Sequence, residues 1–354
     1  MLSLEVKPYV LDFKFSARTS RGSMENRKVW FLKVYDQEGN KGIGEVAPIG
    51  RLSPEDVEEV PDLLQALIEA VKNRNAPKTE EEAFALATDL VSDQYPSVRF
   101  GLEVAFLDFV NGGSKYIFRK DLQKLKIPIN GLVWMGDKNF MQEQVAEKLE
   151  AGFNCIKLKV GALDFESELE VIKSLRKISD DLIIRLDANG AFHTNEVLFK
   201  LRDLSKYNIH SIEQPIMPMQ PEAMELICNR SEIPIALDEE LIGINSSRDR
   251  VDLLQELKPH YLVLKPTLHG GFSSVKEWID LAEMHGIEWW ITSYLESNLG
   301  LNAIAQFASL YPKNEEHHGL GTGSIYHNNI TSPILIDQGF FSYAKSSVWG
   351  DVEA

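Results

Sequence analysis

The stretch Ile183-Ile-Arg-Leu-Asp187 is a short apolar run that ends in a carboxylate, and the same pattern recurs on both sides of it. Upstream, Lys159 ends a similar run, and downstream Glu213, Asp238 and Lys265 do the same. The steps between these five residues are 25 to 28 residues long, which is roughly the length of one strand plus one helix in an eight-unit β/α barrel. The spacing therefore predicts a barrel in which the five side chains lie at one mouth.

Seven short apolar runs match the strands of such a barrel, and each is followed by a polar loop and a helical stretch. They cover residues 129–133, 155–160, 182–186, 209–212, 235–237, 261–264 and 288–292. An eighth run, around residues 318–321, is weaker and has no convincing helix behind it. The sequence thus predicts seven β/α units with a shortened eighth.

The first third of the chain has a different pattern. Residues 4–15 alternate with period two, 28–35 are rich in β-branched and aromatic residues, and 42–46 follow a turn, which predicts a three-stranded antiparallel meander. Helical periodicity follows up to about residue 110, with a predicted helix start at Ser53-Pro54.

These patterns divide the chain into three parts. We expect an α/β protein built as a modified TIM barrel, (β/α)7β, with an N-terminal α+β capping domain. The expected bounds are 1–115 for the capping domain, 116–325 for the barrel and 326–354 for a C-terminal segment with strand character that returns to the cap.

Composition limits the function classes. The net charge of −16 argues against binding to nucleic acid or anionic membranes, which need basic surface. No apolar stretch approaches the roughly 18 residues of a membrane span. Two cysteines cannot form a disulfide framework, and the first residues carry charges where a signal peptide needs an apolar run. We expect a cytoplasmic protein, and its oligomeric state stays open.

The three carboxylates are candidate metal ligands. Asp187, Glu213 and Asp238 end successive predicted strands, and active sites of such barrels form at the carboxyl ends of the strands. Any one of them alone is better explained as a helix cap or a surface charge, but three in register match the oxygen ligands that Mg²⁺ prefers. We therefore predict a Mg²⁺ site, with Mn²⁺ as a substitute metal.

The lysines form the second half of the pattern. Lys157 and Lys159 are two residues apart on one strand, so both side chains point to the same face. Lys265 comes from the sixth strand, nearly across the barrel, which leaves room for a substrate between the amines. A neighbouring cation would lower the pKa of a lysine and make it a base near neutral pH.

These motifs resemble the enolase superfamily in its muconate-lactonizing branch, over almost the whole chain. The resemblance rests on Lys157-Leu-Lys159, Asp187-Ala-Asn-Gly190, Glu213-Gln-Pro215, Asp238-Glu-Glu240 and Val263-Leu-Lys-Pro266. It implies an α+β cap, a modified barrel, and removal of a proton next to a carboxylate to give an enediolate. It also implies that Asp187, Glu213 and Asp238 bind magnesium and that Lys159 and Lys265 are facing acid/base lysines.

Within the branch, four further segments resemble the dehydratases of menaquinone synthesis: 129–136, Arg185 two places before Asp187, 44–48 and 97–103. This implies a Mg²⁺-dependent syn dehydration of a succinyl-hydroxycyclohexadiene carboxylate, a small anionic substrate, to an aromatic product. Lys159 would remove the proton and then help hydroxide to leave as water, with Lys157 supporting the developing charge. The candidate substrate contacts are Arg185, Asn130, Ser20, Ser293, Gly321 and Thr322.

Several rival functions account for parts of the same pattern. Dipeptide epimerases of the branch carry Asp-x-Asp where Gly321-Thr-Gly323 stands here, and Thr292-Ser-Tyr294 lacks the histidine base of mandelate racemases. Racemization of N-succinylamino acids stays open, because it uses the same two lysines and the same metal. A Schiff-base aldolase would leave the three carboxylates unexplained. An inactive barrel that serves only as a binding protein would leave both the carboxylates and the lysines without a role.

Overall fold

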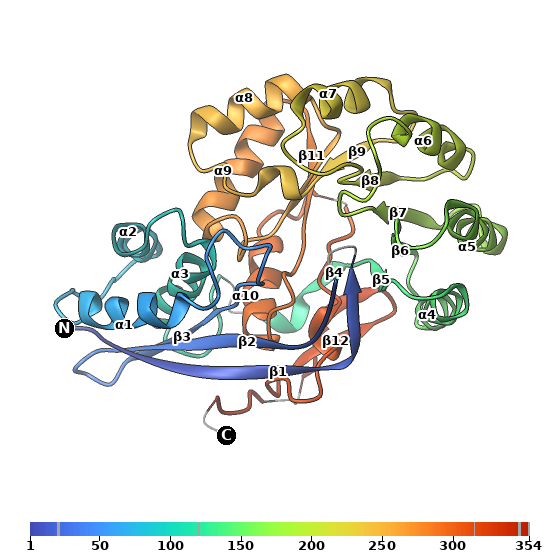
Figure 1. The fold of residues 1–354 in the computed structure, drawn as a ribbon. Helices are drawn as coiled ribbons and strands as arrows, with labels where there is room; N and C mark the ends of the chain where they lie inside the picture. Colours follow the sequence, from blue (N-terminus) through green and yellow to red (C-terminus); the bar gives the residue numbers. More distant parts are fainter. Residues whose placement is uncertain (20–21, 119–120, 315, 346–347, 353–354) are drawn as a thin grey trace.

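A computed structural model describes residues 1–19, 22–118, 121–314, 316–345 and 348–352, with two parts: a cap of strands and helices and a β/α barrel (Figure 1). The long hairpin of the cap runs below the barrel and reaches toward its first strands. Backbone contacts hold it there, because Lys14 N–H donates to the Ile325 carbonyl at 2.9 Å and Phe13 forms a bridge with Tyr326.

The cap sheet is the predicted three-stranded antiparallel meander, in the order β1-β2-β3. Its strands are β1 Ser3–Thr19, β2 Gly22–Tyr35 and β3 Lys41–Val46. The β1–β2 pairing changes register between Asp12 and Ala17, and an irregularity of this kind bends a strand and increases its twist. The hairpin therefore leaves the plane of the cap sheet and brings residues 22–24 to the barrel mouth.

The three cap helices are α1 Val60–Val71, α2 Glu80–Leu90 and α3 Pro96–Val110. Helix α3 lies directly on β3, and the approach requires glycine: a Cβ at Gly44 would lie 1.9 Å from the Gly101 carbonyl oxygen. Nearly every residue of α3 is buried, although the helix lies in the smaller domain.

The predicted helix start at Ser53 is wrong, since α1 begins at Val60 and residues 53–59 form turns. The acids that suggested a first turn serve another helix. Glu55 is buried and accepts a hydrogen bond from the Ser97 N–H at 2.8 Å, so it caps the amino end of α3, which has no side-chain cap of its own.

The barrel sheet is parallel, with seven strands in the order β11-β10-β9-β8-β7-β6-β5. The strands are β5 Gly131–Val133, β6 Cys155–Lys159, β7 Ile183–Asp187, β8 Ser211–Glu213, β9 Ile235–Leu237, β10 Tyr261–Leu264 and β11 Glu288–Ile291. Within the described chain a helix follows each strand: α4 Lys138–Glu150, α5 Phe165–Ile178, α6 Val197–Ser205, α7 Pro221–Arg230, α8 Ser247–Leu257, α9 Gly271–Met284 and α10 Asn298–Ala308. The predicted α/β class and (β/α)7β architecture are confirmed.

The weak eighth unit closes the barrel. Parallel bridges join Ile129 to His318 and Thr292 to Gly319, so the short run 318–319 lies between β11 and β5. Among the described residues it forms only these isolated bridges. This is why its strand signal is faint in the sequence.

The C-terminal strands do not join the cap sheet, although other parts of the segment expected to return to the cap do contact it. β12 Ile334–Asp337 and β13 Phe340–Tyr343 form a hairpin that pairs with β4 Lys126–Pro128 ahead of the barrel, not with the cap sheet. Other parts of the segment do contact the cap: the Lys7 ammonium donates to the Val352 carbonyl at 2.8 Å, and the Tyr9 hydroxyl donates to the Asn328 carbonyl at 2.8 Å.

Two buried carboxylates of the cap join it to the barrel. Glu45 on β3 accepts from the Ser297 N–H at 2.8 Å and the Gly300 N–H at 2.9 Å, at the start of α10. Glu103 on α3 accepts from the Phe272 N–H at 2.5 Å, at the start of α9. A carboxylate at a helix amino end accepts hydrogen bonds from free N–H groups and interacts favourably with the positive end of the helix dipole.

Candidate active site

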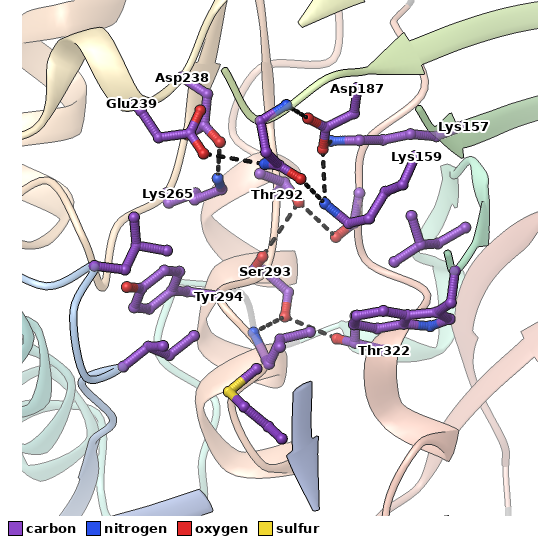
Figure 2. A pocket seen from close by; sticks show the side chains of 18 of the residues that line it. Lys157, Lys159, Asp187, Asp238, Glu239, Lys265, Thr292, Ser293, Tyr294 and Thr322 are labelled. Atoms are coloured by element: carbon purple, nitrogen blue, oxygen red, sulfur yellow. Dashed lines mark hydrogen bonds and ion pairs between the residues drawn. The ribbon is translucent and has the colours of Figure 1, made fainter. Parts of the chain in front are cut away.

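A cavity of about 500 Å³ lies at the carboxyl ends of the barrel strands, where the cap covers the barrel mouth. The barrel lines it with residues at the carboxyl ends of β6, β7, β9 and β10, with Trp290 of β11 and with residues 292–295 after β11. The cap lines it with residues 22–24 of the hairpin and 49–52 of the loop after β3. The predicted lysines all reach this space (Figure 2).

The three carboxylates end adjacent strands, as predicted. Asp187 is the last residue of β7, Glu213 is the last of β8, and Asp238 follows β9. Asp187 and Glu213 are register partners across the β7–β8 pair. All three are at most 2% exposed, so their charges require compensation from neighbouring groups.

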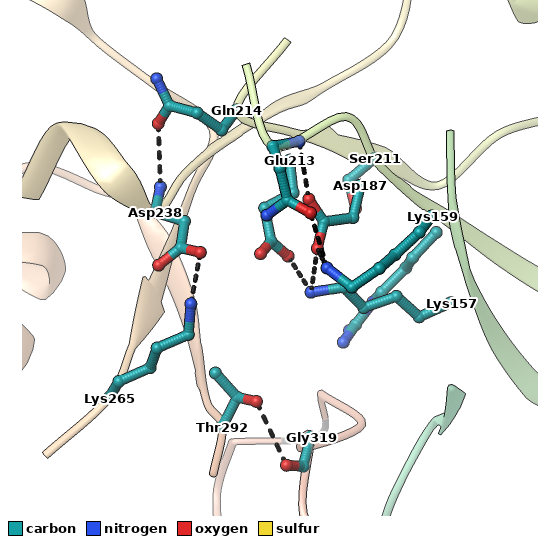
Figure 3. A network of polar contacts seen from close by, with 12 residues as sticks. Lys157, Lys159, Asp187, Ser211, Glu213, Gln214, Asp238, Lys265, Thr292 and Gly319 are labelled. Carbon is teal, nitrogen blue, oxygen red and sulfur yellow. Dashed lines mark hydrogen bonds and ion pairs between the residues drawn. The ribbon is translucent and has the colours of Figure 1, made fainter. Parts of the chain in front are cut away.

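The three lysines supply that compensation (Figure 3). The Lys157 ammonium lies 3.0 Å from Asp187 Oδ2 and 2.5 Å from Glu213 Oε2. The Lys159 ammonium lies 2.9 Å from Asp187 Oδ2, and Lys265 is ion-paired with Asp238. Lys159 with Asp187 and Lys265 with Asp238 lie on opposite sides of the cavity (Figure 2).

Burial and charge move the pKa values of these groups in opposite directions. Burial alone would raise the pKa of Asp187, but the Lys157 and Lys159 ammonium groups hold it below the usual range. Burial and the adjacent Asp187 raise the pKa of Glu213 to about 8. The inner cluster therefore contains two carboxyl groups with a lowered pKa, Asp187 and Asp238, and one, Glu213, that binds a proton more readily.

The carboxylates by themselves hold the pKa values of Lys157 and Lys265 above the usual range, and the lowering expected beside a bound cation stays a prediction. Burial alone would lower both pKa values, but Asp187 and Glu213 raise that of Lys157 and Asp238 raises that of Lys265. The same carboxylates that could bind a cation here stabilise the ammonium forms.

The carboxylates match a hard cation in their chemistry, although they do not converge as a ready cluster. No group of three His, Cys, Asp or Glu side chains is arranged to hold a metal among the described residues. Glu213 Oε1 and Asp238 Oδ1, however, are buried and have no hydrogen-bond partner within the described chain. Buried carboxylate oxygens without partners are costly unless a cation or donor meets them, and oxygen donors are what Mg²⁺ prefers.

Most of the remaining candidate contacts line the cavity. Asn130, Ser293, Gly321 and Thr322 all do so. Asn130 Oδ1 is buried without a hydrogen-bond partner among the described residues, and the Ser293 hydroxyl lies 2.7 Å from the Thr322 hydroxyl. Ser20 lies outside the described residues.

Arg185 is the exception, because the structure places it below the cavity and not in its lining. Its guanidinium is ion-paired with Glu316, donates to the His317 carbonyl at 2.5 Å and lies 3.9 Å from the centre of the Trp290 ring. Arg185 is two residues before Asp187 on the same strand face, so it sits one layer deeper in the barrel. Trp290, to which no role was given from the sequence, separates it from the cavity and lines the floor.

Sequence reasoning missed two residues beside the predicted base. The Lys159 ammonium donates to Asn189 Oδ1 at 2.6 Å, and the Asn189 amide donates to Glu239 Oε1 at 3.0 Å. Asn189 has a positive φ of 44°, which asparagine tolerates better than most residues. Both residues belong to sequence motifs described above, Asp187-Ala-Asn-Gly190 and Asp238-Glu-Glu240. Their closeness in sequence to the predicted metal ligands could have identified them as site residues.

Comparisons with known proteins agree with this geometry. Residues 140–345 match the family model "Enolase C-terminal domain-like". The chain is 39% identical to an o-succinylbenzoate synthase from Desulfotalea psychrophila, over 93% of this chain and 95% of that protein. An N-succinyl-L-Arg/Lys racemase from Bacillus cereus is 24% identical, over 80% and 77% of the two chains.

The structural comparison gives the same result. The crystal structure of MenC from Desulfotalea psychrophila superposes with a TM-score of 0.84 at 37% identity, covering 96% of this chain and 99% of that one.

No helix in the described ranges is both long enough and apolar enough to span a membrane.

Proposed function

The chain belongs to the enolase superfamily and, within it, to the o-succinylbenzoate synthases, which are lyases; from this premise we propose how its own residues carry out the dehydration. The proposed substrate is a succinyl-hydroxycyclohexadiene carboxylate, and the proposed product is o-succinylbenzoate of menaquinone synthesis. The observation that supports the proposal most is the facing pair Lys159 and Lys265 beside three buried carboxylates on adjacent strands.

Asp187, Glu213 and Asp238 are proposed to hold Mg²⁺. Their oxygen-only donor set and the two unpartnered oxygens described above support this. When bound, Mg²⁺ supplies Lewis-acid stabilisation of the negative charge that develops on the substrate carboxylate, an effect worth several kcal/mol.

Lys159 is proposed to act as the base in its neutral amine form. Nζ takes the proton from the ring carbon next to the carboxylate, and the electron pair moves into the carboxylate to give an enediolate. In a syn elimination the hydroxyl leaves from the same face, so the Lys159 ammonium can return that proton as the C–O bond breaks and water departs. Asn189, 2.6 Å from Nζ, holds the amine in position.

The other two lysines are proposed to stabilise charge. Lys157 lies among the carboxylates, within 3.0 Å of Asp187, and adds positive charge near the oxygens of the enediolate. Lys265 lies across the cavity, where its ammonium can face the ring as it becomes aromatic. Loss of water creates the aromatic ring, which favours the forward reaction.

Racemization of N-succinylamino acids is a second candidate, because two amines on opposite faces of a substrate are what a two-base proton exchange needs. Both reactions can be measured on one preparation with Mg²⁺: dehydration by the new aromatic absorbance, and racemization by loss of optical rotation. We expect kcat/KM for dehydration to exceed that for racemization. A preparation that racemizes N-succinylamino acids and forms no aromatic product would overturn the proposed function.

A further inference from the structure

One cation of the cavity takes no part in the chemistry described so far. Of the four cationic side chains in the described lining, Lys157, Lys159 and Lys265 are buried and ion-paired with carboxylates. The fourth, Arg51, comes from the cap loop after β3 and is exposed on the solvent side. Among the described residues it has no ion pair or hydrogen bond, so its charge is available to a ligand.

The backbone at Arg51 is in an unusual conformation. Its φ is 66°, in the left-handed region that arginine rarely adopts. The preceding residue, Gly50, would accept such a conformation without strain, yet the strained position carries the arginine. An observed backbone outlier at the edge of a cavity is a reason to look for a function of the side chain.

Hydrogen bonds fix the conformation of the loop that carries Arg51. The Ile49 N–H donates to the Ser53 hydroxyl at 2.9 Å, and the Ser53 N–H donates to the Ile49 carbonyl at 2.9 Å. The Ser53 hydroxyl also lies 3.2 Å from the hydroxyl of Tyr294, which follows β11 of the barrel. The cap loop is thus attached to the barrel wall, and the position of Arg51 over the cavity is set by both domains.

The proposed substrate has two carboxylates with different requirements. The ring carboxylate is next to the proton that Lys159 removes, so it must lie at the inner cluster of carboxylates and lysines. The second carboxylate ends the succinyl chain, beyond a ketone and two methylene groups, and must extend away from that cluster. The inner lysines are already engaged by Asp187, Glu213 and Asp238.

We propose that Arg51 binds the terminal carboxylate of the succinyl chain and thereby sets the specificity for succinyl substrates. This rests on the proposed dehydration, because it assumes the ring carboxylate at the inner cluster. A guanidinium offers a planar fork of N–H donors that matches both oxygens of a carboxylate. Arg51 is then a binding residue that acts equally on substrate and transition state, remote from the reacting atoms.

Steady-state kinetics with the succinyl substrate tests the role of the side chain. Arg51→Gly removes the guanidinium and relaxes the left-handed backbone, so the loop keeps its shape. We expect KM to rise roughly 10- to 100-fold with kcat within about twofold, the pattern of lost uniform binding. Arg51→Lys should be intermediate, because it keeps the charge without the fork. The matched control is Arg248→Gln, an exposed arginine on α8 remote from the cavity, which should change neither constant.

A thermodynamic cycle that combines the Arg51→Gly substitution with a change of ligand tests whether the terminal carboxylate is the partner of Arg51. The two probes are o-succinylbenzoate and 2-butanoylbenzoate, in which a methyl group replaces the terminal carboxylate, and their affinities are measured by calorimetry. The wild-type protein should prefer o-succinylbenzoate by about tenfold or more, and Arg51→Gly should bind both probes equally. If Arg51→Gly keeps both the wild-type KM and the wild-type preference between probes, the assignment is wrong.

The two proposals fail in different ways. If the wild-type protein binds the probes but forms no aromatic product, the dehydration is wrong while the cycle still reports on Arg51. If the wild-type protein dehydrates the substrate and Arg51→Gly does so with an unchanged KM, only the assignment of Arg51 is wrong.

Discussion

Each ionisable residue of the inner cluster depends on its neighbours. Asp187, Glu213 and Asp238 are nearly inaccessible to solvent, and an unpaired charge in such a place is strongly destabilising. Every one of them has a lysine partner. Removing one charge therefore changes the protonation of the others as well as the chemistry, and substitutions here must be interpreted together with a measurement of folding.

Replacing Lys159 by alanine should abolish most of the turnover. The variant lacks the only group proposed to move the proton, and loss of a positioned base typically lowers the rate by roughly 10²- to 10⁴-fold. Dehydration is followed by absorbance, and circular dichroism checks the fold. Lys177→Ala, an exposed lysine in the last turn of α5, is the control. A fully active, folded Lys159→Ala variant would show that the base has been misassigned.

Replacing Asn189 by glycine should weaken catalysis without removing it. Glycine tolerates the positive φ at this position, so the change deletes the side-chain contact to Lys159 and leaves the backbone unstrained. We expect kcat to fall roughly tenfold with KM within about twofold, because the hydrogen bond that positions Nζ is lost.

Asn208→Gly is the matched control for this prediction. Asn208 also has a positive φ, 50°, but it is exposed and remote from the cavity. Equal kinetics for the two glycine variants would argue against a positioning role of Asn189.

At the scale of elements, the cap docks on the barrel through helix ends. Glu45 and Glu103 place buried carboxylates against the amino ends of α10 and α9. Burial raises the pKa of both groups, and that of Glu103 reaches about 7. The cap–barrel contact is therefore expected to respond to pH.

The stability of the protein should fall as pH rises toward 7, in part through Glu103. The ordinary pKa of the group is 4.5 and the folded-state value is about 7, so between these values the folded state retains a proton that the unfolded chain has released. The free energy of unfolding then decreases with increasing pH, by up to roughly 3 kcal/mol from this group. The contribution is complete below pH 4.5 and lost above 7.

Urea unfolding between pH 4.5 and 8 measures this effect. Glu103→Gln cannot titrate, so its stability should depend less steeply on pH than that of the wild-type protein. Glu225→Gln, an exposed acid in the middle of α7, serves as the control. Identical pH slopes for the wild type and Glu103→Gln would contradict the raised pKa.

The sequence predicts the barrel strands well because each one is short, apolar and followed by a helix at a constant interval. Strands β9 and β10 have the predicted bounds. The helix start at Ser53 fails for a physical reason: the acids that resemble a first turn belong to a loop, and Glu55 caps a helix more than forty residues away in the chain. Local patterns cannot distinguish a cap for the adjacent helix from a cap for a distant one.

At the scale of the whole molecule, the site lies between two domains. The inner cluster could be predicted because the carboxyl ends of all parallel strands meet at the same mouth of a barrel. The prediction of Arg185 as a substrate contact overlooked its spacing: two residues before Asp187 on the same strand face, it lies one layer deeper, where it packs on Trp290 and pairs with Glu316. The cap residues of the cavity, such as Met24 and Arg51, come from loops whose position is set by tertiary contacts that no local pattern contains.

The most direct test of the account is the dehydration rate of one preparation before chelation, after removal of metal with EDTA, and after Mg²⁺ is added back. If Asp187, Glu213 and Asp238 hold a cation that supports the proton transfer, the rate should fall at least roughly 100-fold with EDTA. It should return with Mg²⁺ and, to a similar extent, with Mn²⁺. An aromatic product that continues to form at the original rate after chelation would contradict the metal role of the three carboxylates.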